Sequence, residues 1–174
     1  MQLILAPMQG LVDDVMRDLL TRIGGFDECV SEFVRITHTV HSRPTWLKYV
    51  PEIAQGNRTF AGVPCTVQLL GSDAENMAAN ALEAVRFGAD KIDLNFGCPA
   101  PTVNKHQGGA VLLKEPQRIY HIVKTLRGDG YQVESLNTDQ TETAHNVINY
   151  QPLDLILLRV ADDLPTLAEV RLMV

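Results

Sequence analysis

The sequence lacks the features that mark several large classes of protein. Its longest apolar stretches, such as residues 153–160, are far shorter than the roughly 20 residues of a membrane-spanning helix. No lysine or arginine precedes the short apolar run at the amino terminus, which is not the pattern of a signal peptide. The three cysteines show no Cys-x-x-Cys metal spacing. We therefore expect a cytoplasmic protein with reduced cysteines, no metal and no membrane contact.

Positive charge is also scarce, and its distribution divides the chain. The net charge of −6 does not favour electrostatic binding of nucleic acid by the chain as a whole. Residues 1–127 hold 13 basic and 13 acidic residues, whereas residues 128–174 hold 2 and 8. All 12 glycines lie at or before Gly130. This change in composition predicts a boundary near residue 128.

Short apolar runs alternate with helical patterns along the first part of the chain. We predict strands at residues 3–7, 29–34, 65–70 and 91–96, and helices at 15–23, 73–87 and 117–127. Asp13 or Asp14 is expected to cap the first helix, and Ser72 to form a capping box with Glu75 at the second. The tail continues the pattern, with strands predicted at 131–136 and 153–160 and helices at 141–150 and 165–173.

Repeated βα units with apolar strands predict an α/β fold in which helices cover a parallel sheet. A closed TIM-type (β/α) barrel and an open doubly wound sheet both satisfy this pattern. A complete barrel usually needs about 200–250 residues, which is more than this chain has. The sequence therefore predicts an incomplete barrel or an open sheet.

Polar residues follow the predicted strands, where parallel α/β folds bind their ligands. Ala6–Met8 follow the first strand, Glu32–Arg35 end the second, Gln68 ends the third and Asn95–Cys98 end the fourth. Cys29 and Cys65 lie instead in apolar, strand-like surroundings and are expected to be buried structural thiols. The sequence thus predicts one functional rim on which Cys98 is the important cysteine.

Four segments carry a resemblance to a known family. They are APMQGLVD at 6–13, SEFVR at 31–35, VQLLG at 67–71 and DLNFGCPAPTVNKHQGGAVLL at 93–113. Together they resemble the tRNA-dihydrouridine synthases, FMN-dependent barrel enzymes that reduce uridine in tRNA, and the amino-terminal segments are most similar to the bacterial C-type branch, which modifies the D-loop. The resemblance covers residues 1–127 and implies the amino-terminal half of the barrel.

The resemblance implies roles for seven residues. Cys98 would be the catalytic acid, since a thiol with an ordinary pKa of about 8.5 is mostly protonated at neutral pH. Arg35 and Asn95 would bind the substrate. Pro7, Met8, Gln9 and Gln68 would bind FMN, with NADPH as the reductant.

Residues 128–174 do not continue the family pattern. They lack the later phosphate-binding loops and the tRNA-binding domain, and they weakly resemble a response-regulator receiver in which Arg159 would stand at the position of the phosphate-accepting aspartate. A truncated synthase, a fusion and a chimera all fit this sequence. The alternative to an enzyme is an inactive half-barrel scaffold, and unpaired sheet edges would favour a homo-oligomer.

Overall fold

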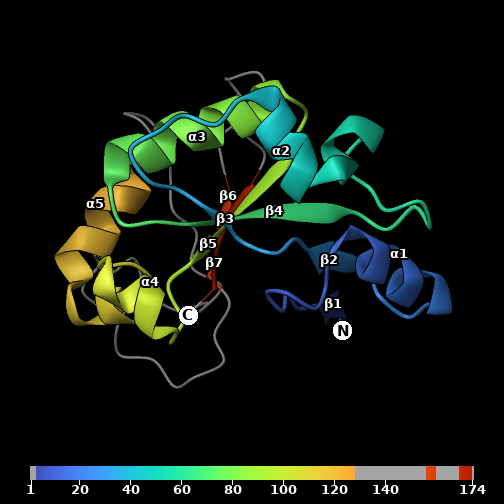
Figure 1. Ribbon diagram of the computed structural model, residues 1–174, viewed down its shortest axis with the longest axis horizontal. Coiled ribbons are helices and arrows are strands. Elements are labelled where there is room, and N and C mark those ends of the chain that lie inside the picture. The colour runs from blue at the N-terminus through green and yellow to red at the C-terminus, as the bar shows by residue number, and fades with distance from the viewer. Residues whose placement is uncertain (1–2, 128–155, 160–168, 174) are drawn as a thin grey trace.

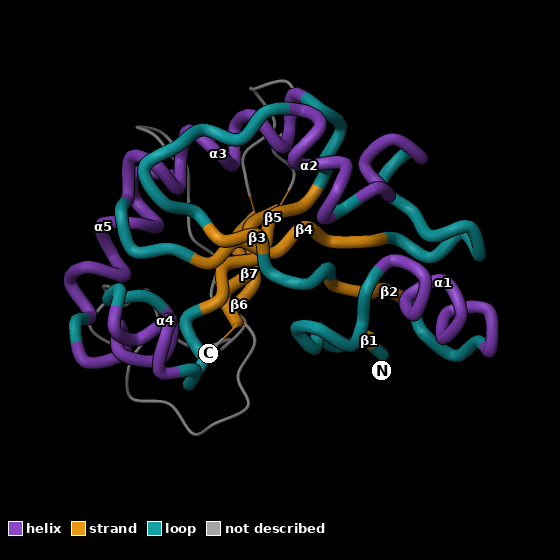
Figure 2. Tube along the Cα trace, viewed as in Figure 1, coloured by secondary structure: helices purple, strands orange, loops and turns teal. Residues whose placement is uncertain are grey.

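The computed structural model describes residues 3–127, 156–159 and 169–173 (Figures 1 and 2). Within these residues the strands follow the order β1-β2-β4-β5-β7-β6, and β3 pairs with β4. Neighbouring strands are parallel except for β6, which runs antiparallel to β7. The strands are β1 Ile4–Leu5, β2 Glu28–Val30, β3 Val34–Arg35, β4 Cys65–Leu70, β5 Lys91–Asn95, β6 Ile156–Arg159 and β7 Glu169–Met173.

Helices cover the outer face of this sheet, as expected for an α/β fold (Figure 1). α3 packs against α5, while α1 lies beside β1 and β2 at the opposite end of the molecule. No helix within the described ranges is long and apolar enough to cross a bilayer. The helices are α1 Asp14–Ile23, α2 Arg43–Tyr49, α3 Ala74–Arg86, α4 Pro101–Lys105 and α5 Pro116–Arg127, with 3-10 turns η1 Pro51–Gln55 and η2 Gly109–Lys114.

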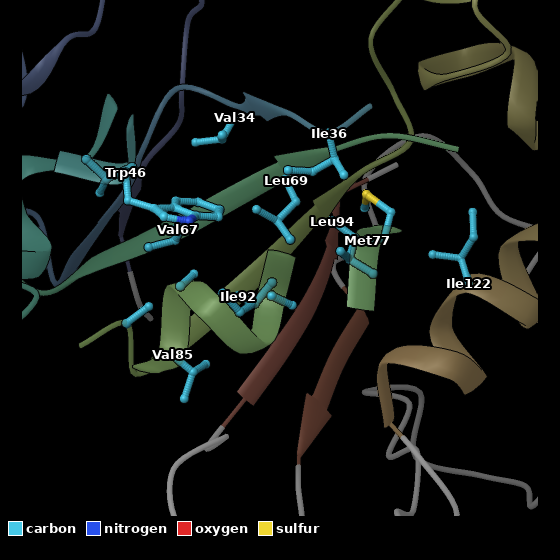
Figure 3. Close-up of a cluster of buried hydrophobic side chains, with 14 of the residues drawn as sticks. Val34, Ile36, Trp46, Val67, Leu69, Met77, Val85, Ile92, Leu94 and Ile122 are labelled. Atoms are coloured by element: carbon cyan, nitrogen blue, oxygen red, sulfur yellow. The ribbon is translucent and has the colours of Figure 1, made fainter. Parts of the chain in front are cut away.

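The apolar core lies between the central strands and the helices (Figure 3). Alternate residues of a strand point to opposite faces, so one face of β4 and β5 meets the helices and the other lines the inside of the curved sheet. Buried side chains of the outer face include Val67 and Leu69 of β4 and Ile92 and Leu94 of β5. The inner face of the same strands is polar, and this polar face builds the site described below.

Most of the predicted elements of the first 127 residues are confirmed. The strand at 65–70 has the predicted bounds, and the helix predicted at 117–127 is confirmed with Pro116 as its first residue. Asp13 caps α1 by accepting a hydrogen bond from Met16 N at 2.9 Å. The predicted Ser72 capping box is wrong: Asp73 caps α3 and accepts from Asn76 N at 2.8 Å. Aspartate caps a helix as well as serine does, and α3 begins one residue later than predicted.

The single strand predicted at 29–34 is also wrong, because it divides into β2 and β3. Ser31 lies at the break, and its hydroxyl accepts a hydrogen bond from Gln68 N at 3.0 Å, where an unbroken strand would offer a carbonyl. β2 pairs with the first half of β4 and β3 with the second half. The break directs Glu32 toward the amino-terminal loop, where its carboxylate accepts from Gly10 N.

The tail departs from the predicted βα repeat. The strand predicted at 153–160 is confirmed for residues 156–159, but the helix predicted at 165–173 is wrong, because residues 169–173 form β7. Val170 pairs with Ile92 and Leu172 with Leu94, so β5 supplies backbone partners that a helix would leave unused. Alternation of charged and apolar residues from Glu169 to Leu172 is the period of a strand. The predictions at 131–136 and 141–150 lie outside the described residues.

Candidate active site at the inner rim of the sheet

A cavity of about 310 Å³ opens on the polar inner face of the sheet. Its size is at the lower end of the range for small-molecule sites. It gathers residues from four separate parts of the sequence, as the strand-end argument predicts. The lining residues are Pro7, Gln9, Phe33, Gln68, Asn95, Gly97 and Cys98.

A chain of amide and carboxylate groups forms one wall of the cavity. Asn95 Nδ2 donates to Gln68 Oε1 at 3.0 Å, and Gln68 Nε2 donates to Asp93 Oδ2 at 2.6 Å. Gln68 and Asp93 are fully buried and stand opposite each other in the β4–β5 register. Gln68 lies within β4 and not at its end, because Leu69 and Leu70 follow it in the strand. The bonds fix the direction in which the amide of Gln68 meets the cavity.

Asn95 also holds the loop that carries Cys98. Its Oδ1 accepts hydrogen bonds from Gly97 N and Cys98 N, each at 3.0 Å. These two bonds occupy the two lone pairs of that oxygen. The amide of Asn95 therefore links β4 to the Cys98 loop. Its oxygen already accepts two hydrogen bonds within the protein and has no lone pair left for a ligand.

The loop closes on itself behind Cys98. The Cys98 carbonyl accepts from Ala110 N at 2.9 Å. The Asn104 side chain donates to Pro99 O at 3.0 Å and accepts from Val111 N at 3.2 Å. Cys98 itself is half-buried at the cavity wall. These bonds hold the thiol on a fixed loop and leave it accessible.

Two predicted site residues lie apart from the cavity wall. Met8 is 50% exposed, and its carbonyl accepts from Leu11 N and Val12 N to form the turn after β1. Arg35 is exposed at the end of β3, where its carbonyl accepts from His41 Nε2 at 3.0 Å. The structure thus brings Pro7, Gln9, Gln68, Asn95 and Cys98 together and places Met8 and Arg35 outside that group.

The other two cysteines are buried, as predicted. Cys29 and Cys65 are 0% and 1% exposed and face each other across β2 and β4. A side-chain hydrogen bond with Cys29, together with burial, raises the pKa of Cys65 well above its ordinary value. The thiol of Cys65 therefore stays protonated, and a protonated buried thiol reacts slowly.

Comparison with known proteins identifies the family. The dihydrouridine synthase family model matches residues 4–132. The chain belongs to the dihydrouridine synthase family. Its relatives named tRNA-dihydrouridine(16) synthase include one from Neisseria meningitidis serogroup A, 88% identical over 126 residues, and one from serogroup B, 87% identical over 127 residues. A Pseudomonas putida protein of the same name is 57% identical over 127 residues.

The match to these relatives is partial on both sides. It covers 72% of this chain and 38% of the serogroup A relative, with 73% and 39% for the Pseudomonas putida protein. The chain thus spans about two fifths of the length of the curated relatives that it matches. The predicted α/β fold class is confirmed: the family is a TIM-type barrel, and the described residues supply part of one.

The donor set of the cavity fits the ring system of a flavin. The edge of an isoalloxazine ring alternates carbonyl and nitrogen groups, and the side-chain amides of Gln9 and Gln68 can both donate and accept hydrogen bonds. Pro7 and Phe33 add apolar surface to the same wall. Among the described residues, those lining the cavity include no lysine or arginine that would pair with a phosphate. The cavity fits the ring better than the phosphate.

Phe33, Asp93 and Asn104 belong to the site or its support, and sequence reasoning missed all three. A signal was present for two of them. Phe33 lies inside the SEFVR segment, and Asp93 is a carboxylate between two apolar residues of a predicted strand, where burial usually requires a partner. Asn104 had no comparable signal, because its two bonds depend on how the loop folds back on itself.

Proposed function

We propose that this site reduces uridine to 5,6-dihydrouridine in the D-loop of tRNA, with FMN as cofactor and NADPH as reductant. The observation that carries the proposal is the position of Cys98, whose thiol lies on a fixed loop beside the amides of Gln68 and Asn95. The names of the relatives support the same reaction. We propose further that the 174-residue chain alone supplies only part of the machinery.

Each residue has a role that its position allows. Cys98 holds the proton that C5 of the uracil receives. Asn95 donates one amide N–H to Gln68 and has the other to offer to the base, while its oxygen holds the Cys98 loop. Arg35, exposed at the rim, meets the flipped nucleotide or its phosphate. Bound and reduced FMN would supply a hydride for C6 of the uracil, and that hydride together with the proton held by Cys98 would convert the double bond into a single bond.

The flavin would rest on the residues of the cavity floor. Pro7, Gln9 and Gln68 line the cavity and would contact the ring, and Met8 would contribute backbone groups of the turn that precedes Leu11. The target uridine must leave its stack to reach this depth, which costs a few kcal/mol and less in a loop than in a duplex. A cytoplasmic location follows from the proposed substrate.

We expect the isolated chain to bind FMN weakly, because no basic residue lines the described cavity. Charge-assisted hydrogen bonds contribute about 1.5–3 kcal/mol each, and the loss of two weakens binding by at least about a hundredfold. The purified chain should be colourless after desalting and should form no dihydrouridine on unmodified tRNA with NADPH. A yellow protein that retains flavin absorbance would show instead that residues outside the described cavity supply a phosphate site.

The role of Cys98 is tested by alkylation of the native protein and mass spectrometry. Cys98 should react first, because Cys29 and Cys65 are buried and the pKa of Cys65 is raised by its hydrogen bond with Cys29 and by burial. Denatured protein, in which all three thiols react, is the control. Faster labelling of Cys29 or Cys65 than of Cys98 in the native protein would refute the proposed role of Cys98.

An inactive scaffold is the second candidate function, and the open sheet favours it. β1 and β6 are the end strands of the described order, and unpaired strand edges tend to self-associate. We propose that the isolated chain forms a homo-oligomer through these edges, and that its unit boundary lies near residue 128, close to the end of the family match at 132. Light scattering across a concentration series tests the oligomer: a constant monomer mass would refute it.

A further inference from the structure

The side-chain amides of Gln68 and Asn95 lie next to each other in the cavity wall, and each has two unlike ends. The oxygen of an amide only accepts hydrogen bonds, and the nitrogen only donates them. What the cavity offers to a ligand therefore depends on which way each amide is turned. The neighbours of an amide decide its orientation, because a donor must meet an acceptor.

The orientation is fixed first at the backbone of the Cys98 loop. Gly97 N and Cys98 N are donors that cannot become acceptors, and both lie 3.0 Å from Asn95 Oδ1. If Asn95 were turned over, its own N–H groups would point at these two donors. Asn95 therefore turns its oxygen to the loop and its nitrogen to Gln68, where Nδ2 donates to Oε1 at 3.0 Å.

The orientation of Asn95 determines that of Gln68, and Asp93 receives the last of these bonds. Because Gln68 accepts from Asn95 through its oxygen, its nitrogen points the other way. Gln68 is fully buried, so an N–H group without an acceptor would be costly there. Asp93 stands opposite Gln68 in the register of β4 and β5, is also fully buried, and accepts from Gln68 Nε2 at 2.6 Å.

We infer that Asp93 is the positioning residue of this site and sets the direction of its hydrogen bonds through Gln68 and Asn95. Every link runs the same way, from the Cys98 loop toward Asp93. As a result Asn95 holds the loop with its oxygen and meets a ligand only as a donor, so it selects a carbonyl oxygen over an amino group. The inference deepens the proposed function and rests on it for the ligand. Its tests use neither cofactor nor tRNA, so a chain that fails to reduce uridine would refute only the proposed function.

An exchange of carboxylate and amide between positions 93 and 95 tests this direction in the full 174-residue chain. In Asn95→Asp the new carboxylate still accepts from the loop but cannot donate to Gln68, so two acceptors face each other. At about pH 8, where an exposed carboxyl group is ionised, this variant should raise the equilibrium constant of unfolding at least about tenfold in urea titrations. Adding Asp93→Asn should recover most of that loss, because Gln68 can then turn over, donate to residue 95 and accept from residue 93.

The double-mutant cycle separates this link from any other contact of Asp93, because such contacts change equally in both backgrounds. Glu28→Gln is the matched control. Glu28 on β2 is another buried carboxylate, and it accepts from the Thr66 hydroxyl and not from an amide of the cavity. Combined with Asn95→Asp, this control should recover none of the lost stability. If Asn95→Asp does not fold, folding of the double variant is itself the recovery.

Two further measurements report the direction of the bonds and the state of the loop. In nuclear Overhauser spectra the Nε2 protons of Gln68 should lie near the Hβ protons of Asp93 in the parent, and near those of residue 95 in the double variant. Cys98 labelling should change about threefold or more in Asn95→Asp and return to within about twofold of the parent in the double variant. An Asn95→Asp variant as stable as the parent, a double variant no more stable than that single one, equal recovery with Glu28→Gln, or unchanged Gln68 contacts would each overturn the inference.

Discussion

Gly109 lies against the backbone of Cys98, and adding one methyl group there should disturb the site. An alanine Cβ at this position would lie 2.4 Å from Cys98 O and 2.9 Å from Val103 Cγ1. The first neighbour is a backbone carbonyl that already accepts from Ala110 N, so it cannot move away without losing that bond. Gly109 also has φ +66°, a conformation that L-residues rarely adopt.

Gly56 is a matched control for the cost of placing an L-residue in the left-handed backbone conformation. It has φ +68°, and nothing lies within 4 Å of a Cβ placed there. Gly56→Ala should therefore cost only the left-handed conformation, about 1–2 kcal/mol. Gly109→Ala adds overpacking of about 1–3 kcal/mol and a lost hydrogen bond of about 0.5–1.5 kcal/mol. The two variants should differ by about 1.5–4.5 kcal/mol in the free energy of unfolding.

Urea denaturation measures this difference, and alkylation of the native proteins measures the site itself. The Cys98 labelling rate should change by about threefold or more in Gly109→Ala, because a shift of the Cys98 carbonyl changes the conformation of the loop on which the thiol lies. The same rate should stay unchanged in Gly56→Ala. Equal losses of stability in the two variants, with equal Cys98 labelling, would refute the role of this contact.

Three further predictions concern the fold. Glu52→Ala should lower the free energy of unfolding by about 3–5 kcal/mol, measured by urea titration, because it leaves the fully buried Arg17 charge unpaired; a loss below about 1 kcal/mol would contradict this. Asp73→Ala should cost about 0.5–2 kcal/mol at pH 7. The backbone hydrogen bond from Asn76 lowers the pKa of Asp73 in the folded protein. The stability that Asp73 adds is therefore fully present above the unfolded pKa of about 3.9 and is lost as the pH falls through the folded pKa. A stability difference between wild type and Asp73→Ala that stays unchanged in urea titrations down to pH 3 would contradict this. Native proteolysis should cut near residue 128 sooner than within 65–127, and the reverse order would refute the boundary.

The sequence by itself determined the class of fold and the place of the site. β4 is a largely apolar run, β5 alternates polar and apolar residues at the strand period, and α5 opens with a proline where a helix tolerates one. These signals are local, and so are the segments that identified the family. Since the carboxyl ends of parallel strands meet at one rim, Gln68, Asn95 and Cys98 were expected together, and the cavity contains all three.

Only the tertiary structure decided which of these side chains support the site by hydrogen bonds and which of them are positioned by others. The commitment of Asn95 to the Cys98 loop, the pairing of Gln68 with Asp93 and the buried Arg17–Glu52 ion pair join residues through contacts that no periodicity reports. The same holds for residues 169–173, whose local pattern allows both a helix and a strand and which become β7 because β5 offers its backbone. Local propensity differs between helix and strand by only about 1 kcal/mol per residue, and the hydrogen bonds and burial offered by a neighbouring strand outweigh it.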